Sequence, residues 1–67
     1  MNKTNILMII ENAILFDVHT KFGYTAKELN QDKFEFVTDK LIRITEGYKT
    51  YTYIDIGAID RITVKEE

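Results

Sequence analysis

The last third of the chain alternates between apolar and polar residues with a period of two. Residues 41–45, 48–56 and 59–64 are rich in β-branched and aromatic side chains, and Gly47 and Gly57 punctuate them. Alternation of this kind, with glycine between the runs, is typical of paired antiparallel strands. We therefore predict three consecutive strands that form a meander at the carboxyl end of the chain.

Within the strand expected over residues 48–56, isoleucine and tyrosine fall on opposite faces. Ile54 and Ile56 share one face, whereas Tyr51 and Tyr53 lie on the other together with Lys49. Successive side chains of a strand point to opposite sides of the sheet. If the isoleucines line the core, both tyrosines project outward.

The period of two also extends over residues 14–24. A single helix would place Asp17 on the same face as the apolar residues that precede it, so the strand is the better interpretation. Asp17 and His19 then share the face that we expect to meet solvent. The opposite, apolar face comprises Ile14, Phe16, Val18, Phe22 and Tyr24.

The pattern leaves two alternatives open for residues 5–10. The segment can pair as a strand with the strand that follows, or form one or two turns of helix with Thr4 or Asn5 as the cap. The apolar run from Ile6 to Ile10 spans five residues, whereas a membrane-spanning helix needs about 20. No small-residue cleavage site follows it, so we expect neither a signal peptide nor a membrane anchor.

A short helix is predicted over residues 26–31. Thr25 and Glu28 have the spacing of a capping box, and Ala, Lys, Glu and Leu all favour helix. A further strand follows over residues 34–38, where Phe34 and Phe36 alternate with polar residues.

Together these elements predict one domain over residues 1–67, of the mainly β (α+β) class. Five or six short strands with one short helix are expected to curl around one core as a small antiparallel roll or partly open barrel. Residues 56–59 suit a tight 3₁₀-like corner before the last strand. This corner resembles those of SH3-like barrels and bacterial pleckstrin-like sheets.

Composition narrows the classes of partner. The 67 residues carry a net charge of −2 and no cysteine, which excludes disulfides and thiolate metal sites and is compatible with a cytoplasmic location. Binding to a nucleic-acid backbone usually needs a basic patch, so this charge disfavours nucleic acid. Heavy use of Ile, Lys and Asn would fit a bacterial or phage accessory protein.

Candidate catalytic and metal-binding groups are few. Asp17 and His19 would supply two metal ligands on one face, but the sequence offers no third. Serine and cysteine are absent, and no group is marked as an activated nucleophile. Asp55 and Asp60 flank Gly57 as a carboxylate pair, which strand ends explain equally well. We expect no enzyme activity, no metal and no cofactor.

The aromatic strand face is the leading functional candidate. Tyr51, Tyr53, Lys49 and Arg43 of the neighbouring strand are predicted to form a partner-binding surface, because tyrosine and arginine are favoured at protein interfaces. The alternative is stacking on bases of a single-stranded nucleic acid. Short strands in so small a domain leave exposed edges, so a homodimer is also expected.

Overall fold

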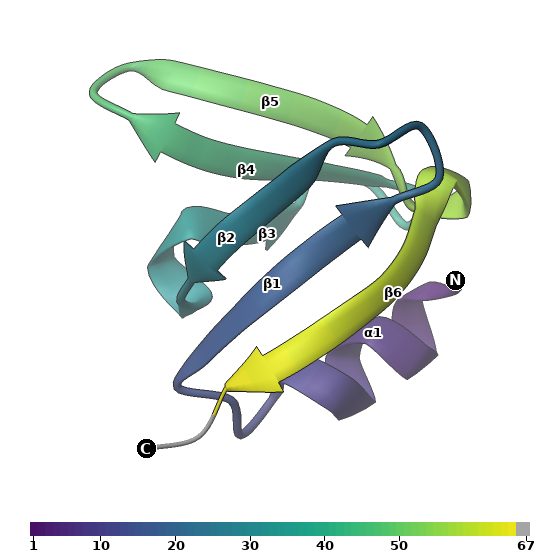
Figure 1. Ribbon diagram of the computed structural model, residues 1–67. Helices are drawn as coiled ribbons and strands as arrows, with labels where there is room; N and C mark the ends of the chain where they lie inside the picture. Colours follow the sequence, from purple (N-terminus) through teal and green to yellow (C-terminus); the bar gives the residue numbers. More distant parts are fainter. Residues whose placement is uncertain (66–67) are drawn as a thin grey trace.

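The computed structural model describes residues 1–65 and contains one short α-helix, α1 (Lys3–Ile10), with six antiparallel strands (Figure 1). The strands are β1 (Leu15–Thr20), β2 (Thr25–Leu29), β3 (Phe34–Phe36), β4 (Leu41–Gly47), β5 (Thr50–Asp55) and β6 (Ile59–Lys65). They form two three-stranded sheets, ordered β2-β1-β6 (sheet A) and β3-β4-β5 (sheet B). This confirms the predicted mainly β fold, a small roll or barrel-like arrangement.

Two 3₁₀ turns carry the chain between the sheets. The turn η1 (Gln31–Lys33) links β2 to β3, and η2 (Ile56–Ala58) links β5 to β6. In η2 the carboxylate of Asp55 accepts the backbone N–H of Gly57 at 2.8 Å. The corner expected before the last strand is therefore present, with an aspartate side chain as its cap.

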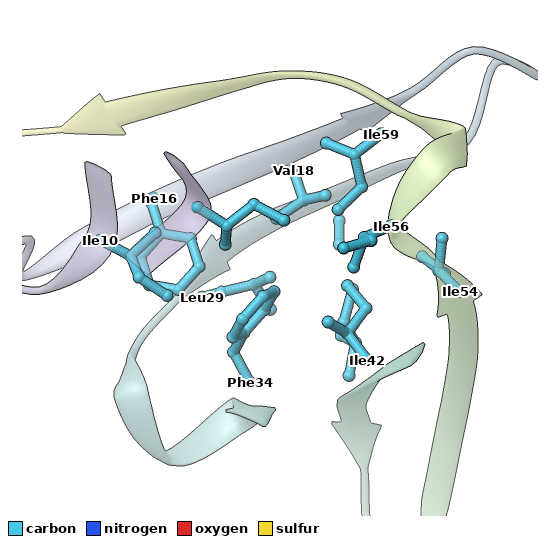
Figure 2. Packing of buried hydrophobic residues seen from close by; sticks show 12 residues of the cluster. Ile10, Phe16, Val18, Leu29, Phe34, Ile42, Ile54, Ile56 and Ile59 are labelled. Atoms are coloured by element: carbon cyan, nitrogen blue, oxygen red, sulfur yellow. The ribbon is translucent and has the colours of Figure 1, made fainter. Parts of the chain in front are cut away.

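The inner faces of the two sheets enclose one hydrophobic core (Figure 2). Phe16 of sheet A meets Phe34 of sheet B edge to face, with ring centroids 5.6 Å apart. The buried apolar residues are Ile6, Ile10, Phe16, Val18, Ala26, Leu29, Phe34, Ile42, Ile44, Ile54, Ile56 and Ile59.

Helix α1 settles the alternative that the sequence leaves open for residues 5–10. Its N-cap is Asn2, whose side chain accepts the N–H of Asn5, rather than Thr4 or Asn5 as expected. Ile6 and Ile10, four residues apart, point into the core. No helix among residues 1–65 is long and apolar enough to cross a membrane.

The helix predicted over residues 26–31 is wrong. Thr25–Leu29 is strand β2, and only the 3₁₀ turn η1 follows it. Ala26 pairs with Val18 and Leu29 with Phe16 of β1, and β2 buries Ala26 and Leu29 in the core. This burial outweighs the modest local preference for helix.

The strand predicted over residues 14–24 is shorter than expected. β1 ends at Thr20, whose N–H donates to the carbonyl of Tyr24 across a turn. Gly23 lies in this turn at a φ of 92°, a conformation that glycine tolerates best. The turn leaves Phe22 exposed (66%), and Ile14 before the strand is exposed as well, so neither joins the core.

Candidate partner-binding surface

The outer face of sheet B carries a row of side chains that crosses all three strands. Glu35 of β3 pairs with Arg43 of β4, and Arg43 pairs in turn with Tyr53 of β5. Tyr51 lies two residues before Tyr53 on the same face, opposite Thr45. We call the surface formed by Glu35, Arg43, Tyr51 and Tyr53 the tyrosine–arginine face.

The prediction that the isoleucines of this segment face the core and its tyrosines face outward is confirmed. Tyr51 and Tyr53 are 46% and 54% exposed, whereas Ile54 between Tyr53 and the corner is 3% exposed. Ile42 and Ile44 of β4 are buried on the same inner side. The core therefore lies behind sheet B, and both phenol rings face outward.

Arg43 is the centre of the tyrosine–arginine face. It forms an ion pair with Glu35, and its guanidinium carbon lies 4.7 Å from the ring centroid of Tyr51, within the range of a cation–π interaction. Its interaction with Tyr53 raises the pKa of Arg43 above its ordinary value, and the charge of Glu35 acts in the same direction. The guanidinium is therefore a fixed positive charge held between an acid and two phenols.

Lys49 lies at the end of this surface rather than within it. It occupies the β4–β5 turn at a φ of 52°. Its ammonium is 5.2 Å from the ring of Tyr48, which is 86% exposed at the tip of the hairpin. Of the four predicted partner-binding residues, the structure brings Arg43, Tyr51 and Tyr53 together and places Lys49 at their margin.

A second polar cluster links the two sheets, and sequence reasoning missed it. The Tyr24 hydroxyl donates to one carboxylate oxygen of Glu46, and the Thr52 hydroxyl donates to the other at 2.5 Å. Burial and then Glu46 raise the pKa of Tyr24 to about 12. Hydrogen bonds from Thr52 and Tyr24 lower the pKa of Glu46. The three residues belong to separate segments, so no local pattern in the sequence predicts that they meet.

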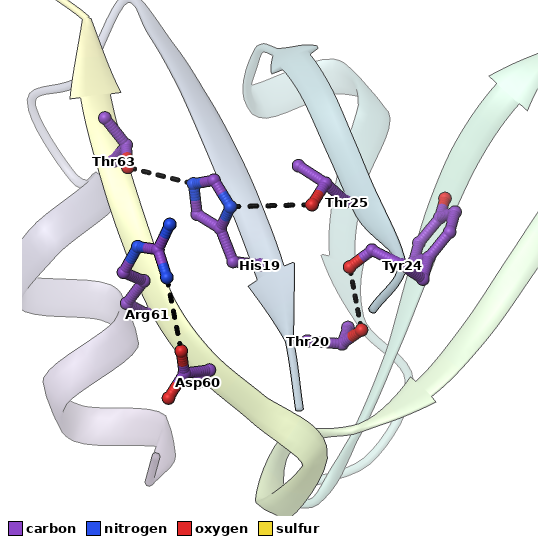
Figure 3. Close-up of polar contacts among 7 residues, drawn as sticks. All are labelled: His19, Thr20, Tyr24, Thr25, Asp60, Arg61 and Thr63. Carbon is purple, nitrogen blue, oxygen red and sulfur yellow. Dashed lines mark hydrogen bonds and ion pairs between the residues drawn. The ribbon is translucent and has the colours of Figure 1, made fainter. Parts of the chain in front are cut away.

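His19 occupies the outer face of sheet A. Its ring lies between the hydroxyls of Thr63 on β6 and Thr25 on β2, at 2.9 Å and 3.5 Å (Figure 3). Both ring nitrogens therefore have protein partners across the sheet.

Asp17 is buried, whereas we predicted that it would face solvent. It is 7% exposed, because it lies on the central strand of sheet A. Its carboxylate accepts the N–H of Glu28 at 2.8 Å and approaches the Lys65 ammonium at 3.5 Å. The hydrogen bond from Glu28, reinforced by Lys65, lowers the pKa of Asp17 despite its burial. Its contacts are structural.

The other carboxylate pair is divided between separate partners. Asp55 caps η2 through the N–H of Gly57, whereas Asp60 pairs with Arg61 at 3.3 Å (Figure 3). Over residues 1–65 no three or more His, Cys, Asp or Glu side chains gather as a potential metal site. The same part of the chain holds no pocket.

Comparisons with protein-family models, with curated proteins and with solved structures found no match for the chain. Among the surfaces described above, the tyrosine–arginine face carries the side-chain types that are most typical of a protein interface.

Proposed function

We propose that this protein is a small non-enzymatic interaction module that binds another protein through its tyrosine–arginine face. The observation that carries the proposal is the arrangement of Arg43 with two exposed tyrosines on the outer face of sheet B. Such a module would act as a regulator or adaptor by occupying a surface of its partner in the cytoplasm.

The types of side chain support this proposal. Tyrosine and arginine are enriched among residues that dominate the free energy of protein binding. A tyrosine contributes a large, rigid ring together with one polar group, so little conformational entropy is lost when it is covered. Tyr51 and Tyr53 stand on a strand whose opposite face is packed in the core, and this fixes their backbone.

The arrangement of Arg43 also favours binding. Immobilising a flexible side chain in an interface costs about 0.5–1.5 kcal/mol. The ion pair with Glu35 and the contact with Tyr51 already restrict the guanidinium in the free protein. Arg43 therefore loses less conformational entropy when a partner binds.

Charge favours a protein over a nucleic acid as the partner. Glu35 offsets the positive charge of Arg43 within the face itself, and the whole chain has a net charge of −2. A phosphate backbone would meet no continuous basic stripe on this face. A protein surface with an apolar patch would match the phenol rings, and hydrogen-bonding groups beside that patch would match the Arg43–Glu35 pair.

Affinity capture with single-residue variants tests the proposal. Tagged protein is used to isolate binders from lysate of the source cells, and the affinity of each purified binder is measured by isothermal titration. Arg43→Ala and Tyr53→Ala should each weaken binding about fivefold or more, because truncation of a central contact costs over about 1 kcal/mol.

Two variants serve as matched controls. Tyr48→Ala removes an exposed tyrosine at the hairpin tip, and Arg61→Ala removes an exposed arginine on sheet A. Both should bind like the unmodified protein. A binder that is unaffected by Arg43→Ala and Tyr53→Ala would contradict the proposal. Salt-dependent binding of single-stranded DNA or RNA that is lost with these variants would support the nucleic-acid alternative instead.

A further inference from the structure

The outer edge of β5 is open. Among residues 1–65, β5 pairs only with β4, and Figure 1 shows no element lying along its other side. Its residues 50–54 carry no charge and alternate Thr with Tyr before Ile54. An uncharged, regular edge strand is a ready template for another strand.

The hydrogen bonds to β4 reveal which backbone groups face this edge. The N–H of Ile56 donates to the carbonyl of Lys40 at 2.9 Å, and the register pairs Ile54 with Ile42 and Thr52 with Ile44. Bonded pairs alternate along an antiparallel ladder.

It follows that Thr52 and Ile54 direct their N–H and C=O groups toward β4. The N–H and C=O groups of Tyr51 and Tyr53 point away from β4, to the open edge. These four groups are available for a new strand.

The other edges are less suitable for pairing. β3 has three residues. β2 is distorted at Glu28, which has a φ of 55°, and its register with β1 is irregular. β6 carries three charged residues, namely Asp60, Arg61 and Lys65. Charges and distortions of this kind protect edges from association, and β5 lacks both between Thr50 and Ile54.

We infer that the partner of this edge is a second copy of the chain, paired antiparallel along β5 about a twofold axis at Thr52. This register places Tyr51 opposite Tyr53 of the second copy, so their outward N–H and C=O groups form bonded pairs on both sides of the axis. The result is a continuous six-stranded sheet made from two copies of sheet B.

The charges that flank the strand select this register. With the axis at Thr52, Lys49 in the turn just before β5 would come level with Asp55 of the second copy, and the symmetry would repeat this approach at the other end. The Asp55 oxygen Oδ1 accepts the N–H of Gly57, which leaves Oδ2 for the incoming ammonium. Moving the axis to Tyr51 or Tyr53 would remove both ion pairs.

This inference is separate from the proposed function. The dimer uses the backbone edge of β5, whereas the proposed function uses the outward side chains of sheet B. Because the twofold axis stands perpendicular to the sheet, the two tyrosine–arginine faces would lie side by side on one surface. A dimer would therefore present a partner with two adjoining copies of the face.

Amide hydrogen exchange measured by NMR tests the inference on the unmodified chain. The concentration is varied from roughly 10 µM to roughly 1 mM, which covers the affinities expected of a small interface. The Tyr51 and Tyr53 amides should exchange freely when dilute and become protected when concentrated. The Thr52 and Ile54 amides, bonded to β4, should be protected throughout. Exchange of Tyr51 and Tyr53 that is independent of concentration would overturn the inference, as would new protection on β2 or β6 instead.

A charge exchange tests the register. Lys49→Glu alone would place a second carboxylate opposite Asp55, and Asp55→Lys alone would place two ammonium groups opposite each other. Each homodimer should therefore weaken about fivefold or more. An equimolar mixture restores one pair of opposite charges, in reversed order, at one end and the original pair at the other. It should form a heterodimer at concentrations where neither variant self-associates, as measured by sedimentation.

Asp55→Lys also removes the cap of η2, so its folding is checked by circular dichroism. If Asp55→Lys does not fold, amide hydrogen exchange on the unmodified chain decides whether β5 pairs with a second copy. Arg43→Ala separates the two proposals, because it removes the centre of the tyrosine–arginine face but no group of the β5 edge. It should retain the concentration-dependent protection of Tyr51 and Tyr53. Absence of rescue in a mixture of two folded variants would refute the register.

Discussion

The carboxylate of Asp17 connects the strands of sheet A. It lies nearly buried on the central strand of sheet A and accepts a backbone N–H from β2 while facing Lys65 of β6. One side chain thus connects three strands. A charged acceptor that is desolvated stabilises the folded state only while its partners are present.

We expect Asp17→Asn to lower the free energy of unfolding by about 1–3 kcal/mol near neutral pH, because it removes a charged hydrogen-bond acceptor. The folded-state pKa of Asp17 is lowered, so its contribution is present above the ordinary carboxyl pKa of about 4. It is lost as pH falls through the lower, folded-state value. Urea unfolding over this acid range should therefore show the two proteins converging.

Asp39→Asn is the control for this measurement. Asp39 is an exposed carboxylate that pairs with Lys3 at 3.1 Å, and an exposed pair contributes about 0–1 kcal/mol. Equal effects of the two substitutions would contradict the structural role of Asp17.

Tyr24 gives a prediction at alkaline pH. Its pKa is raised to about 12, whereas an unfolded tyrosine ionises near about 10. The neutral phenol therefore stabilises the fold, and this stability is present below about pH 10 and lost as pH rises toward about 12. In an absorbance titration of the four tyrosines, Tyr24→Phe should remove the ionisation near pH 12. Removal of a midpoint near about 10 instead would contradict the contact with Glu46.

At the scale of elements, the helix predicted over residues 26–31 was wrong, and the choice between helix and strand for residues 5–10 was left open. Residues 25–31 have a capping pattern and good helix formers, yet Ala26 and Leu29 are buried through pairing with β1. Local preference amounts to less than about 1 kcal/mol per residue, so tertiary pairing prevails. Residues 3–10 form a helix whose short apolar run fits either period. Only the place of Ile6 and Ile10 in the core decides between them.

Helix α1 is expected to depend on its packing. A helix of eight residues is marginal in water by itself. Ile6→Ala should lower the free energy of unfolding by about 2–5 kcal/mol, because Ile6 is fully buried. Leu7→Ala changes an exposed neighbour and should cost about 0.5 kcal/mol or less. Thermal unfolding of both variants checks this, and equal losses would show that α1 is not docked as described.

At the scale of the whole molecule, the alternation of β5 and its neighbours was informative because one face of sheet B is buried. Ile42, Ile44 and Ile54 face the core, so a shift by one residue would expose all of them. The tyrosine–arginine face could be anticipated for the same reason. The Glu35 ion pair and the Tyr24–Glu46 link could not, because they join residues whose proximity depends on how the strands and sheets meet.

The positive φ of Glu28 affects where unfolding begins at acid pH. A non-glycine residue at a φ of 55° carries about 1–3 kcal/mol of conformational strain, and here the acceptor on Asp17 holds it in place. β2 thus contains a residue, Glu28, whose backbone conformation is strained in the folded state. We therefore expect β2 to be the first strand to detach when acid protonates Asp17, because protonation weakens the acceptor that holds Glu28 in this conformation.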